Sequence, residues 1–435
     1  MATGTAKKFW NGSIDLNDNI GNGLDIKLSY DGKKPVSEIL NTPQANIRLL
    51  WQGEHGTKNR LYYGDNLPIL ANLLRNSEVK GNVRLVYIDP PFSTRSVFQS
   101  RSQMDAYQDL LAGSQYIEFL RERLILLREL LANDGSIYVH LDDNMAFHVK
   151  VIMDEIFGKN NFRNWITRKK CNPKNYTRKA YGNISDYLLF YTKTSDYVWN
   201  RPLESWTSDR AEKEYTYIEK NTGRRYKKVP IHAPGIRHGE TGQPWRGMEP
   251  PPGKHWQFTP KALDEMDAKG EIYWSSNGNP RRKIYLDQSE GVQFQDIWLE
   301  FRDAHNQMVK ISGYPTEKNP NLLELIVKTS SNPGDLILDC FSGSGTTLAV
   351  ASELKRAWIG VDNSHEAITT TLRRFSKGLQ RMGDFVKVTE KPVQNKLIDL
   401  YEPITDFSLF TSITDSNEIK SIKEILDFEF KSASL

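Results

Sequence analysis

The sequence predicts an α/β protein, a doubly wound and mostly parallel sheet of the Rossmann-like kind with an inserted second domain. Two continuous apolar runs, Val83–Ile88 and Leu336–Leu338, are typical of buried parallel strands. Each is followed by helical periodicity, in Tyr116–Leu131 and from about Thr346. Alternation of strand and helix at this spacing indicates βαβ units, which build a parallel sheet.

The remaining elements divide the chain into five parts. Helical spacing in Leu67–Leu74 and strand patterns in Ser136–Leu141 and Trp358–Val361 extend the α/β pattern. Helical periodicity fades from about Lys193 to His305, where Gly, Pro and Trp accumulate. One short helix is expected in this stretch, at Pro260–Lys269. An amphipathic stretch, Ile419–Phe430, lies near the end. The predicted parts are an N-terminal extension (1–58), a catalytic half (59–193), an insertion (194–305), a cofactor-binding half (306–392) and a C-terminal tail (393–435).

Composition narrows the class of protein. The 435 residues are 38% apolar, which suffices for a large core and a second lobe. No apolar run is long enough to predict a membrane span. The two cysteines, Cys171 and Cys340, lie far apart in the sequence and predict neither a disulfide framework nor a cysteine zinc site, so a reducing cytoplasm is expected.

A glycine-rich string, DCFSGSGTT, begins at Asp339 directly after the strand Leu336–Leu338. Glycines let the backbone approach a ligand, and the start of a helix offers free N–H groups to a carboxylate. A P-loop would need Lys followed by Ser or Thr, and a dinucleotide fingerprint would need glycine where Leu348 stands. S-adenosylmethionine requires neither, but it needs an acid near its ribose, and Asp362 follows the strand Trp358–Val361. The alternative is a plain helix-capping turn.

The string Asp89-Pro90-Pro91-Phe92 stands at the carboxyl end of a predicted strand, where ligands collect in open α/β sheets. An adenine amine is a poor nucleophile because its lone pair is delocalised, and two hydrogen acceptors would draw the nitrogen toward tetrahedral geometry. The Asp89 carboxylate and the Pro90 carbonyl can be these acceptors, since consecutive prolines add no competing N–H. Phe92 offers a face for a base swung out of the duplex. The alternative is a turn in which the prolines only end the strand.

These motifs stand in a fixed order with other characteristic strings: Leu61–Asn66 (LYYGDN), Tyr87–Phe92, Gly135–Asn144, Asp186–Lys193, Tyr314–Ser331, Asp335–Thr347 and Ile359–Asp362. Together they resemble the beta-class amino-methyltransferases of bacterial restriction–modification systems, especially the modification subunits of type III systems. The resemblance covers roughly 60–193 and 280–375. It implies an S-adenosyl-L-methionine-dependent, site-specific DNA methyltransferase that flips adenine from double-stranded DNA and methylates N6, with a Rossmann-like methyltransferase fold.

The resemblance also implies which residues bind the cofactor. Asp339, Phe341, Gly343, Ser344, Gly345 and Thr346 resemble the loop around its methionine end, Asp362 the ribose acceptor, Asp65 the contact to its adenine amine, and Lys318 the segment that covers it. In that covering segment the family commonly has Thr-Gln-Lys-Pro, whereas this chain has the longer string TEKNP. Cytosine-N4 members usually begin the catalytic motif with Ser, so Asp89 favours adenine; cytosine N4 stays the alternative.

Basic residues predict where DNA binds. Between residues 163 and 193, cations interleave with aromatic residues against the single acid Asp186. A solvated charged face is the alternative. The resemblance makes the insertion the target-recognition domain. The predicted DNA contacts are Arg168, Lys169, Lys170, Lys174, Arg178, Lys179, Arg224, Arg225, Arg246, Arg281 and Arg282.

Metals and partners complete the prediction. His140, Asp142 and Asp143 are interpreted as a strand end lining the base pocket, and no metal is expected because a sulfonium leaving group is already activated. The expected partner is double-stranded DNA in a bacterial or archaeal cytoplasm, associated with the nucleoid and not with a membrane. A homodimer and a restriction subunit stay open as further partners. The non-enzymatic alternative is a DNA-binding protein with a degenerate methyltransferase fold.

Overall fold

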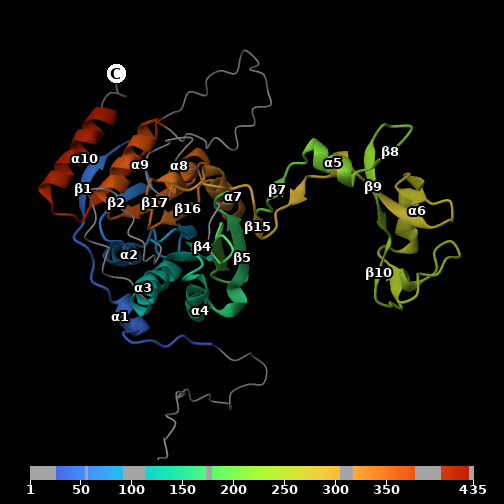
Figure 1. Ribbon diagram of the computed structural model, residues 1–435, viewed down its shortest axis with the longest axis horizontal. Helices are drawn as coiled ribbons and strands as arrows, with labels where there is room; N and C mark the ends of the chain where they lie inside the picture. Colours follow the sequence, from blue (N-terminus) through green and yellow to red (C-terminus); the bar gives the residue numbers. More distant parts are fainter. Residues whose placement is uncertain are drawn as a thin grey trace, which may run out of the picture. The chain divides into compact units, whose positions relative to one another are not determined.

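The computed structural model describes residues 26–53, 57–91, 113–172, 179–303, 317–377 and 403–430. These residues form two compact units (Figure 1). Unit 1 combines Met1–Asn200 with Asp296–Leu435, and unit 2 is Arg201–Gln295. Unit 2 therefore falls inside the stretch 194–305 that lacks helical periodicity.

A mixed sheet organises unit 1. Six neighbouring strands, from β18 to β4, run parallel, whereas β1, β6 and β5 pair with antiparallel neighbours. This confirms the predicted doubly wound, mostly parallel fold. Among the described residues the strand order is β1 (Arg48–Gln52), β18 (Phe407–Thr411), β2 (Asn59–Tyr63), β17 (Ala357–Asp362), β16 (Leu336–Asp339), β3 (Val83–Ile88), β4 (Leu131–Leu141), β6 (Ser185–Thr192), β5 (Phe162–Lys169) and β15 (Ile297–Trp298).

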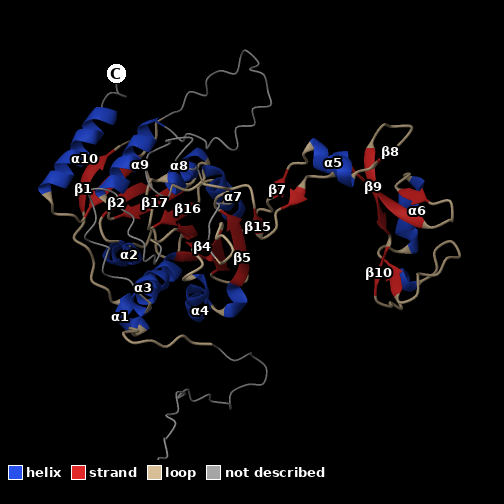
Figure 2. Ribbon diagram, in the orientation of Figure 1, coloured by secondary structure: helices blue, strands red, loops and turns tan. Residues whose placement is uncertain are grey.

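Helices cover both faces of this sheet (Figure 2). One layer contains α1 (Val36–Leu40), α2 (Asn66–Leu74), α3 (Ser114–Leu130) and α4 (Ala146–Phe157). The other contains α7 (Pro320–Ser330), α8 (Thr346–Glu353), α9 (His365–Lys377) and α10 (Ser416–Glu429). Helix α3 buries Leu120, Leu124 and Leu127, which recur on one helical face, against the sheet. None of the described helices has the length and apolar character needed to cross a bilayer.

Both ends of the chain contribute to the sheet. Strand β1 comes from the predicted N-terminal extension, and β18, from the predicted tail, lies between β1 and β2. Phe407 of β18 is fully buried, and its ring centroid lies 4.6 Å from that of Trp51 in β1 and 5.7 Å from that of Phe430 after α10. Aromatic packing therefore fixes the end of the chain to the edge of the sheet.

Unit 2 has its own small core. Ile231, Trp245, Trp256, Leu263 and Ile272 are buried together. The core lies between α6 (Pro260–Ala268) and a sheet ordered β12 (Ile272–Trp274), β13 (Pro280–Tyr285), β9 (Arg225–Pro230) and β8 (Tyr217–Ile218). The further elements are β7 (Leu203–Glu204), α5 (Ser208–Glu214), β10 (His232–Pro234), β11 (Lys254–Trp256) and β14 (Val292–Gln293). The expectation of a single helix here is wrong, because α5 is a second one; it is too short for periodicity to reveal.

Candidate active site

The two sequence motifs meet at a switch point of the sheet. Strands β3 and β16 are parallel neighbours, with Val86 opposite Leu338. The chain leaves β3 through α3 toward β4 on one side, and leaves β16 through α8 toward β17 on the other. Connections that diverge in this way open a crevice at the carboxyl ends of the strands, where open α/β sheets bind ligands. Asp89, after β3, and the glycine loop, after β16, both emerge there.

Asp89 presents a carboxylate with one oxygen occupied and one oxygen unused. Its Oδ2 lies 2.9 Å from Nζ of Lys318, and the two side chains are 18% and 8% exposed. Its Oδ1 is buried and accepts no hydrogen bond within the described part of the chain. A buried acceptor without a donor is costly unless a ligand supplies the donor. Pro90 is buried and Pro91 exposed, while Phe92 lies outside the described residues.

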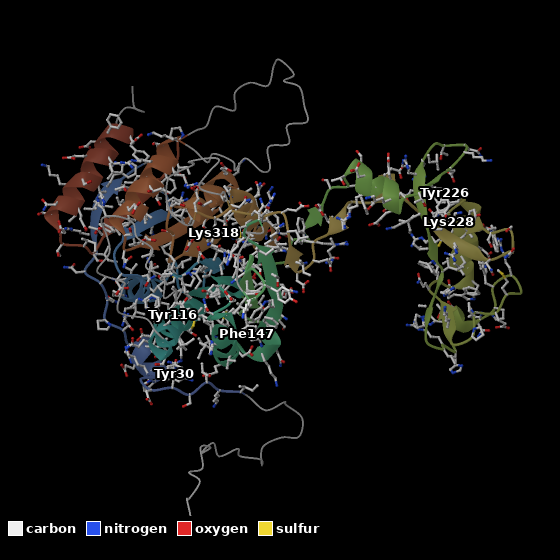
Figure 3. The ribbon with its side chains drawn as sticks, in the orientation of Figure 1. Tyr30, Tyr116, Phe147, Tyr226, Lys228 and Lys318 are labelled. Atoms are coloured by element: carbon white, nitrogen blue, oxygen red, sulfur yellow. The ribbon has the colours of Figure 1, made fainter. Side chains whose placement is uncertain are left out.

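Lys318 carries a positive charge at this site (Figure 3). Burial lowers its pKa, but the charges of Asp89 and Asp303 outweigh that effect and raise the pKa overall. The ammonium group therefore stays protonated beside the Asp89 carboxylate. The sequence predicted that Lys318 covers the cofactor, and it did not reveal that Lys318 pairs with Asp89.

The glycine loop is held by contacts from β17 and α9. The N–H of Gly343 donates to Oδ2 of Asp362 at 2.8 Å, and Thr371 Oγ1 donates to the Gly343 carbonyl at 3.0 Å. Gly345 has φ +72°, and a Cβ there would come within 2.6 Å of Thr371. A side chain at 345 would thus combine left-handed strain with a clash, so the tight turn requires glycine. Ser344 and Thr346 are buried, with their hydroxyl oxygens 3.1 Å apart.

Two acids, Asp339, which is buried, and Asp362, which is partly buried, give the loop an affinity for positive charge. Burial, with a smaller contribution from the charges of Asp89 and Asp362, raises the pKa of Asp339 to about 7. Burial likewise raises the pKa of Asp362, whose Oδ1 also accepts the Ser364 N–H at 2.9 Å. These carboxyls repel one another when ionised, so a cationic ligand placed among them would stabilise their charged forms.

Asp65 lies at the same sheet edge. It caps α2 by accepting the Leu67 N–H at 3.0 Å, and it lies 3.2 Å from Nη2 of Arg123. The next residue, Asn66, donates from Nδ2 to the Cys340 carbonyl at 2.7 Å. This bond ties the start of α2 to the glycine loop. The side chain of Asp65 is 60% exposed, so its carboxylate is open to a ligand.

A buried polar chain lies behind the catalytic motif. The Tyr87 hydroxyl is 2.8 Å from Nδ1 of His140, and Nε2 of His140 is 2.9 Å from Oδ2 of Asp186. Burial raises the pKa of Tyr87 well above its usual value, so the phenol keeps its proton and can donate to Nδ1. Burial alone would raise the pKa of Asp186, but His140 and Arg168 lower it well below the ordinary range. This chain was not predicted from the sequence.

Arg168 corrects one predicted DNA contact. Its side chain is fully buried, and Nε and Nη2 donate to the two carboxylate oxygens of Asp186 at 2.9 Å each. Nη1 and Nη2 also donate to Asp303, at 2.9 and 2.5 Å. Four of the five N–H donors of this guanidinium bond internal carboxylates and its side chain has no exposed surface, so it cannot reach a phosphate. The prediction that Arg168 binds DNA is therefore wrong for this structure.

The other predicted DNA contacts differ in how accessible they are. In unit 1, Lys169 and Lys170 are partly exposed and Lys179 is exposed, while Lys174 and Arg178 lie outside the described residues. In unit 2, three arginines form exposed or partly exposed ion pairs: Arg224 with Asp287, Arg225 with Glu212, and Arg246 with Asp264 and Asp267. Arg281 is exposed and Arg282 partly exposed.

One face of the unit 2 sheet combines basic and aromatic side chains. The strand register places on it the residues that we call the basic aromatic face: Tyr217, Tyr226, Lys228, Tyr273, Arg281, Lys283 and Tyr285. Nζ of Lys228 lies 3.6 Å from the ring centroid of Tyr217 and 3.4 Å from that of Tyr273. Figure 3 labels Lys228 and Tyr226, which both belong to β9. The opposite face carries Ile272, which packs into the core beside α6. Tyr217 and Lys228, and not only the predicted arginines, thus belong to this surface.

The sequence of the chain matches a family of known proteins. A family model described as DNA methylase matches residues 83–373, which include both motifs. The chain belongs to the DNA methylase family. The type II methyltransferase M.EcaI of Enterobacter cloacae is 44% identical over 420 residues, covering 92% of this chain and 91% of that protein. This chain is thus a DNA methyltransferase of the N6/N4 group.

More distant relatives are also similar. The Mod subunit of the type III restriction–modification enzyme StyLTI of Salmonella typhimurium is 26% identical over 363 residues, covering 75% of this chain. The match covers 54% of that subunit, so this methyltransferase spans about half of its length. Among solved structures, the M1.HpyAVI–SAM complex is 16% identical with a TM-score of 0.40, covering 73% of this chain and 98% of that one.

Proposed function

We propose that this methyltransferase transfers a methyl group from S-adenosyl-L-methionine to N6 of adenine in double-stranded DNA. The observation that carries the proposal is the buried, unpartnered Oδ1 of Asp89 beside the glycine loop. In this reaction Oδ1 accepts one hydrogen of the amine and the Pro90 carbonyl accepts the other. The nitrogen lone pair then attacks the methyl carbon, the sulfonium leaves as a neutral thioether, and the extra proton passes to water.

The glycine loop supports S-adenosylmethionine as the donor. Its sulfonium and its ammonium group are cations, and the acids at the ends of β16 and β17 are Asp339, which is buried, and Asp362, which is partly buried. Asp65 is exposed at the same sheet edge and can accept from the cofactor's adenine amine. Phe341, Gly343, Ser344, Gly345 and Thr346 form the turn that would enclose the methionine end.

Asp89 also supports adenine over cytosine. Cytosine-N4 members of the resembling family usually begin the catalytic motif with Ser, whereas this chain has Asp89. Because Oδ1 is buried in the protein, an adenine still stacked in a duplex could not reach it, so the base must leave the stack. Cytosine N4 is the second candidate, since the family includes methyltransferases of both amines.

The DNA is proposed to meet cations in both units. Lys169, Lys170 and Lys179 lie on or beside β5 in unit 1, and the basic aromatic face of unit 2 adds Lys228, Arg281 and Lys283. Cations neutralise phosphates, while aromatic rings contact bases and sugars. The match to nearly the full length of M.EcaI supports a type II context over a type III one.

A methylation assay with nucleoside analysis tests the proposal. Native protein, Asp89→Ala and the exposed control Asp196→Ala are incubated with duplex DNA and tritiated S-adenosylmethionine. The DNA is then digested and its nucleosides are separated. The label is expected in N6-methyldeoxyadenosine for native protein and control. Asp89→Ala is expected to lose methylation but to keep cofactor binding, measured by calorimetry.

Two results would contradict parts of this proposal. Label in N4-methyldeoxycytidine would show that the substrate base is cytosine and not adenine, while the methyl-transfer reaction would stand. Methylation by Asp89→Ala at the native rate would remove Asp89 from the mechanism.

A further inference from the structure

Three consecutive residues before α7, Glu317, Lys318 and Asn319, are bonded to different parts of the site. Glu317 Oε1 accepts from Nη2 of Arg374 at 2.5 Å, and Lys318 Nζ lies 2.9 Å from Asp89 Oδ2. Asn319 caps α7 by accepting the Asn321 N–H at 2.9 Å. We call residues 317–319 the bridge segment.

The bridge segment links the glycine loop to the catalytic carboxylate. Arg374, which binds Glu317, also donates from Nε to the Ser344 carbonyl at 2.7 Å. The side chains of Arg374, Glu317 and Lys318 are 3%, 7% and 8% exposed. Buried ion pairs hold one geometry, because breaking them would leave a charge without solvent or partner.

We propose that Lys318 is a positioning residue, which fixes Oδ2 of Asp89 so that Oδ1 faces the amine of the substrate. This inference rests on the proposed role of Asp89. It assigns Lys318 to the methyl-acceptor side of the reaction, whereas the sequence placed Lys318 over the cofactor.

The physical reason lies in the freedom of a carboxylate. The terminal torsion of an Asp side chain has a broad, roughly two-fold energy profile, so sterics alone do not fix the plane of the carboxylate. Lys318 fixes that plane by holding one oxygen. Its ammonium group is a donor only, so it occupies Oδ2 and leaves Oδ1 to accept from the amine of the substrate.

Other charged and titratable groups surround the pair. They are Tyr87 and Tyr116 on the Asp89 side, Asp339 at the glycine loop, and Asp303, Arg168 and Asp186 on the Lys318 side. Arg168 is fully engaged with Asp186 and Asp303. Lys318 is thus the cation in direct contact with Asp89, and removing it changes the charge next to that carboxylate.

The test compares Lys318→Met with Lys328→Met in full-length protein. Lys328 is a matched control, because it is a lysine at the other end of α7 with a 55% exposed side chain. Single-turnover methylation is measured with saturating S-adenosylmethionine and DNA. Lys318→Met is expected to lower the rate about 100-fold, the effect of misplacing a reacting group by about 1 Å. Cofactor affinity and the control rate are expected to stay within about twofold of native.

Rescue by arginine separates positioning from a general loss of structure. Lys318→Arg keeps a cation that can hold Oδ2 of Asp89, so it is expected to recover most of the rate. If Lys318→Met does not fold, Lys318→Gln replaces it, since glutamine keeps a donor but not the charge.

The outcomes distinguish this inference from the proposed function. A native rate in Lys318→Met, while Asp89→Ala is inactive, overturns the role of Lys318 alone. Loss of cofactor affinity as large as the loss of rate makes Lys318 a cofactor residue and also overturns it. So does a loss in Lys318→Arg equal to that in Lys318→Met. Native activity of Asp89→Ala removes the proposed function and this inference together.

Discussion

Replacing Arg168 by methionine separates a structural cation from a DNA-binding one. The substitution removes four charge-assisted hydrogen bonds and leaves Asp186, 2% exposed, and Asp303, 28% exposed, facing the space that Arg168 filled. An exposed ion pair contributes about 0–1 kcal/mol to the free energy of unfolding, but losing one partner of a buried pair lowers that free energy by about 3–5 kcal/mol. Because Arg168 is fully buried, the second range applies.

The expected effect is large enough to measure by thermal unfolding. With an unfolding entropy of about 2.1 cal/mol/K per residue, the roughly 340 residues of unit 1 give about 1.4 °C in the unfolding midpoint per kcal/mol, so Arg168→Met is expected to lower the midpoint by about 4–7 °C. Lys169→Met is the matched control, since Lys169 is the next residue of β5 and is partly exposed. We expect Lys169→Met to unfold within about 1–2 °C of native protein.

DNA affinity, measured at several salt concentrations, is expected to change in Lys169→Met and not in Arg168→Met, the opposite of the expectation for stability. A lysine that binds a phosphate contributes about one unit to the slope of log affinity against log salt, so Lys169→Met is expected to reduce that slope. Arg168→Met, assayed well below its unfolding midpoint, is expected to keep the native slope. Normal stability together with a reduced slope in Arg168→Met would refute the burial argument and restore Arg168 as a DNA contact.

Two further predictions concern the glycine loop. Gly345→Ala and Gly334→Ala both place a side chain at positive φ, +72° and +87°, but a Cβ meets Thr371 only at 345 and open space at 334. Both variants are expected to lose about 1 kcal/mol of unfolding free energy. Only Gly345→Ala is expected to lose cofactor affinity, by about tenfold in calorimetry. Equal affinities in the two variants would show that the turn tolerates a side chain. Burial raises the pKa of Asp339 from 3.8 in the unfolded chain to about 7 in the folded one. Below about pH 4 the carboxyl is neutral in both states and costs no stability. As pH rises toward 7, the unfolded chain ionises first and the free energy of unfolding falls. Asp339→Asn cannot ionise, and its unfolding free energy relative to native protein is expected to grow by about 4 kcal/mol between pH 4 and pH 8; a difference that does not vary with pH would contradict the raised pKa.

The centre of the fold was predictable because buried parallel strands are apolar along their whole length. The run Val83–Ile88 became β3, and the helical spacing in Tyr116–Leu131 became α3 at Ser114–Leu130. Strand β18, at Phe407–Thr411, was not predicted, because Ser408 and Thr411 interrupt its apolar run. Its neighbours β1 and β2 also come from the opposite end of the chain, so no local pattern connects them.

The sequence indicates that Arg168 forms an internal ion pair, but the basic composition of residues 163–193 hides this pattern. Arg168 and Ile166 are buried two residues apart on β5, so they share a face of the strand. The register of β5 and β6 places Arg168 opposite Asp186, the single acid of that basic segment. A lone acid opposite a strand cation favours an internal pair. Counting charges along the segment loses this signal, since alternate residues of a strand face opposite sides.

Lys318 shows a different limit. A local string such as TEKNP identifies a segment that enters a helix, and Asn319 and Pro320 do begin α7. It does not reveal which acid the lysine meets, because that depends on how α7 packs near the end of β3. In the structure, Glu317 of this string contacts the glycine loop through Arg374, and Lys318 contacts Asp89 directly. Both contacts join segments that lie far apart in the sequence, so no local pattern could have predicted them.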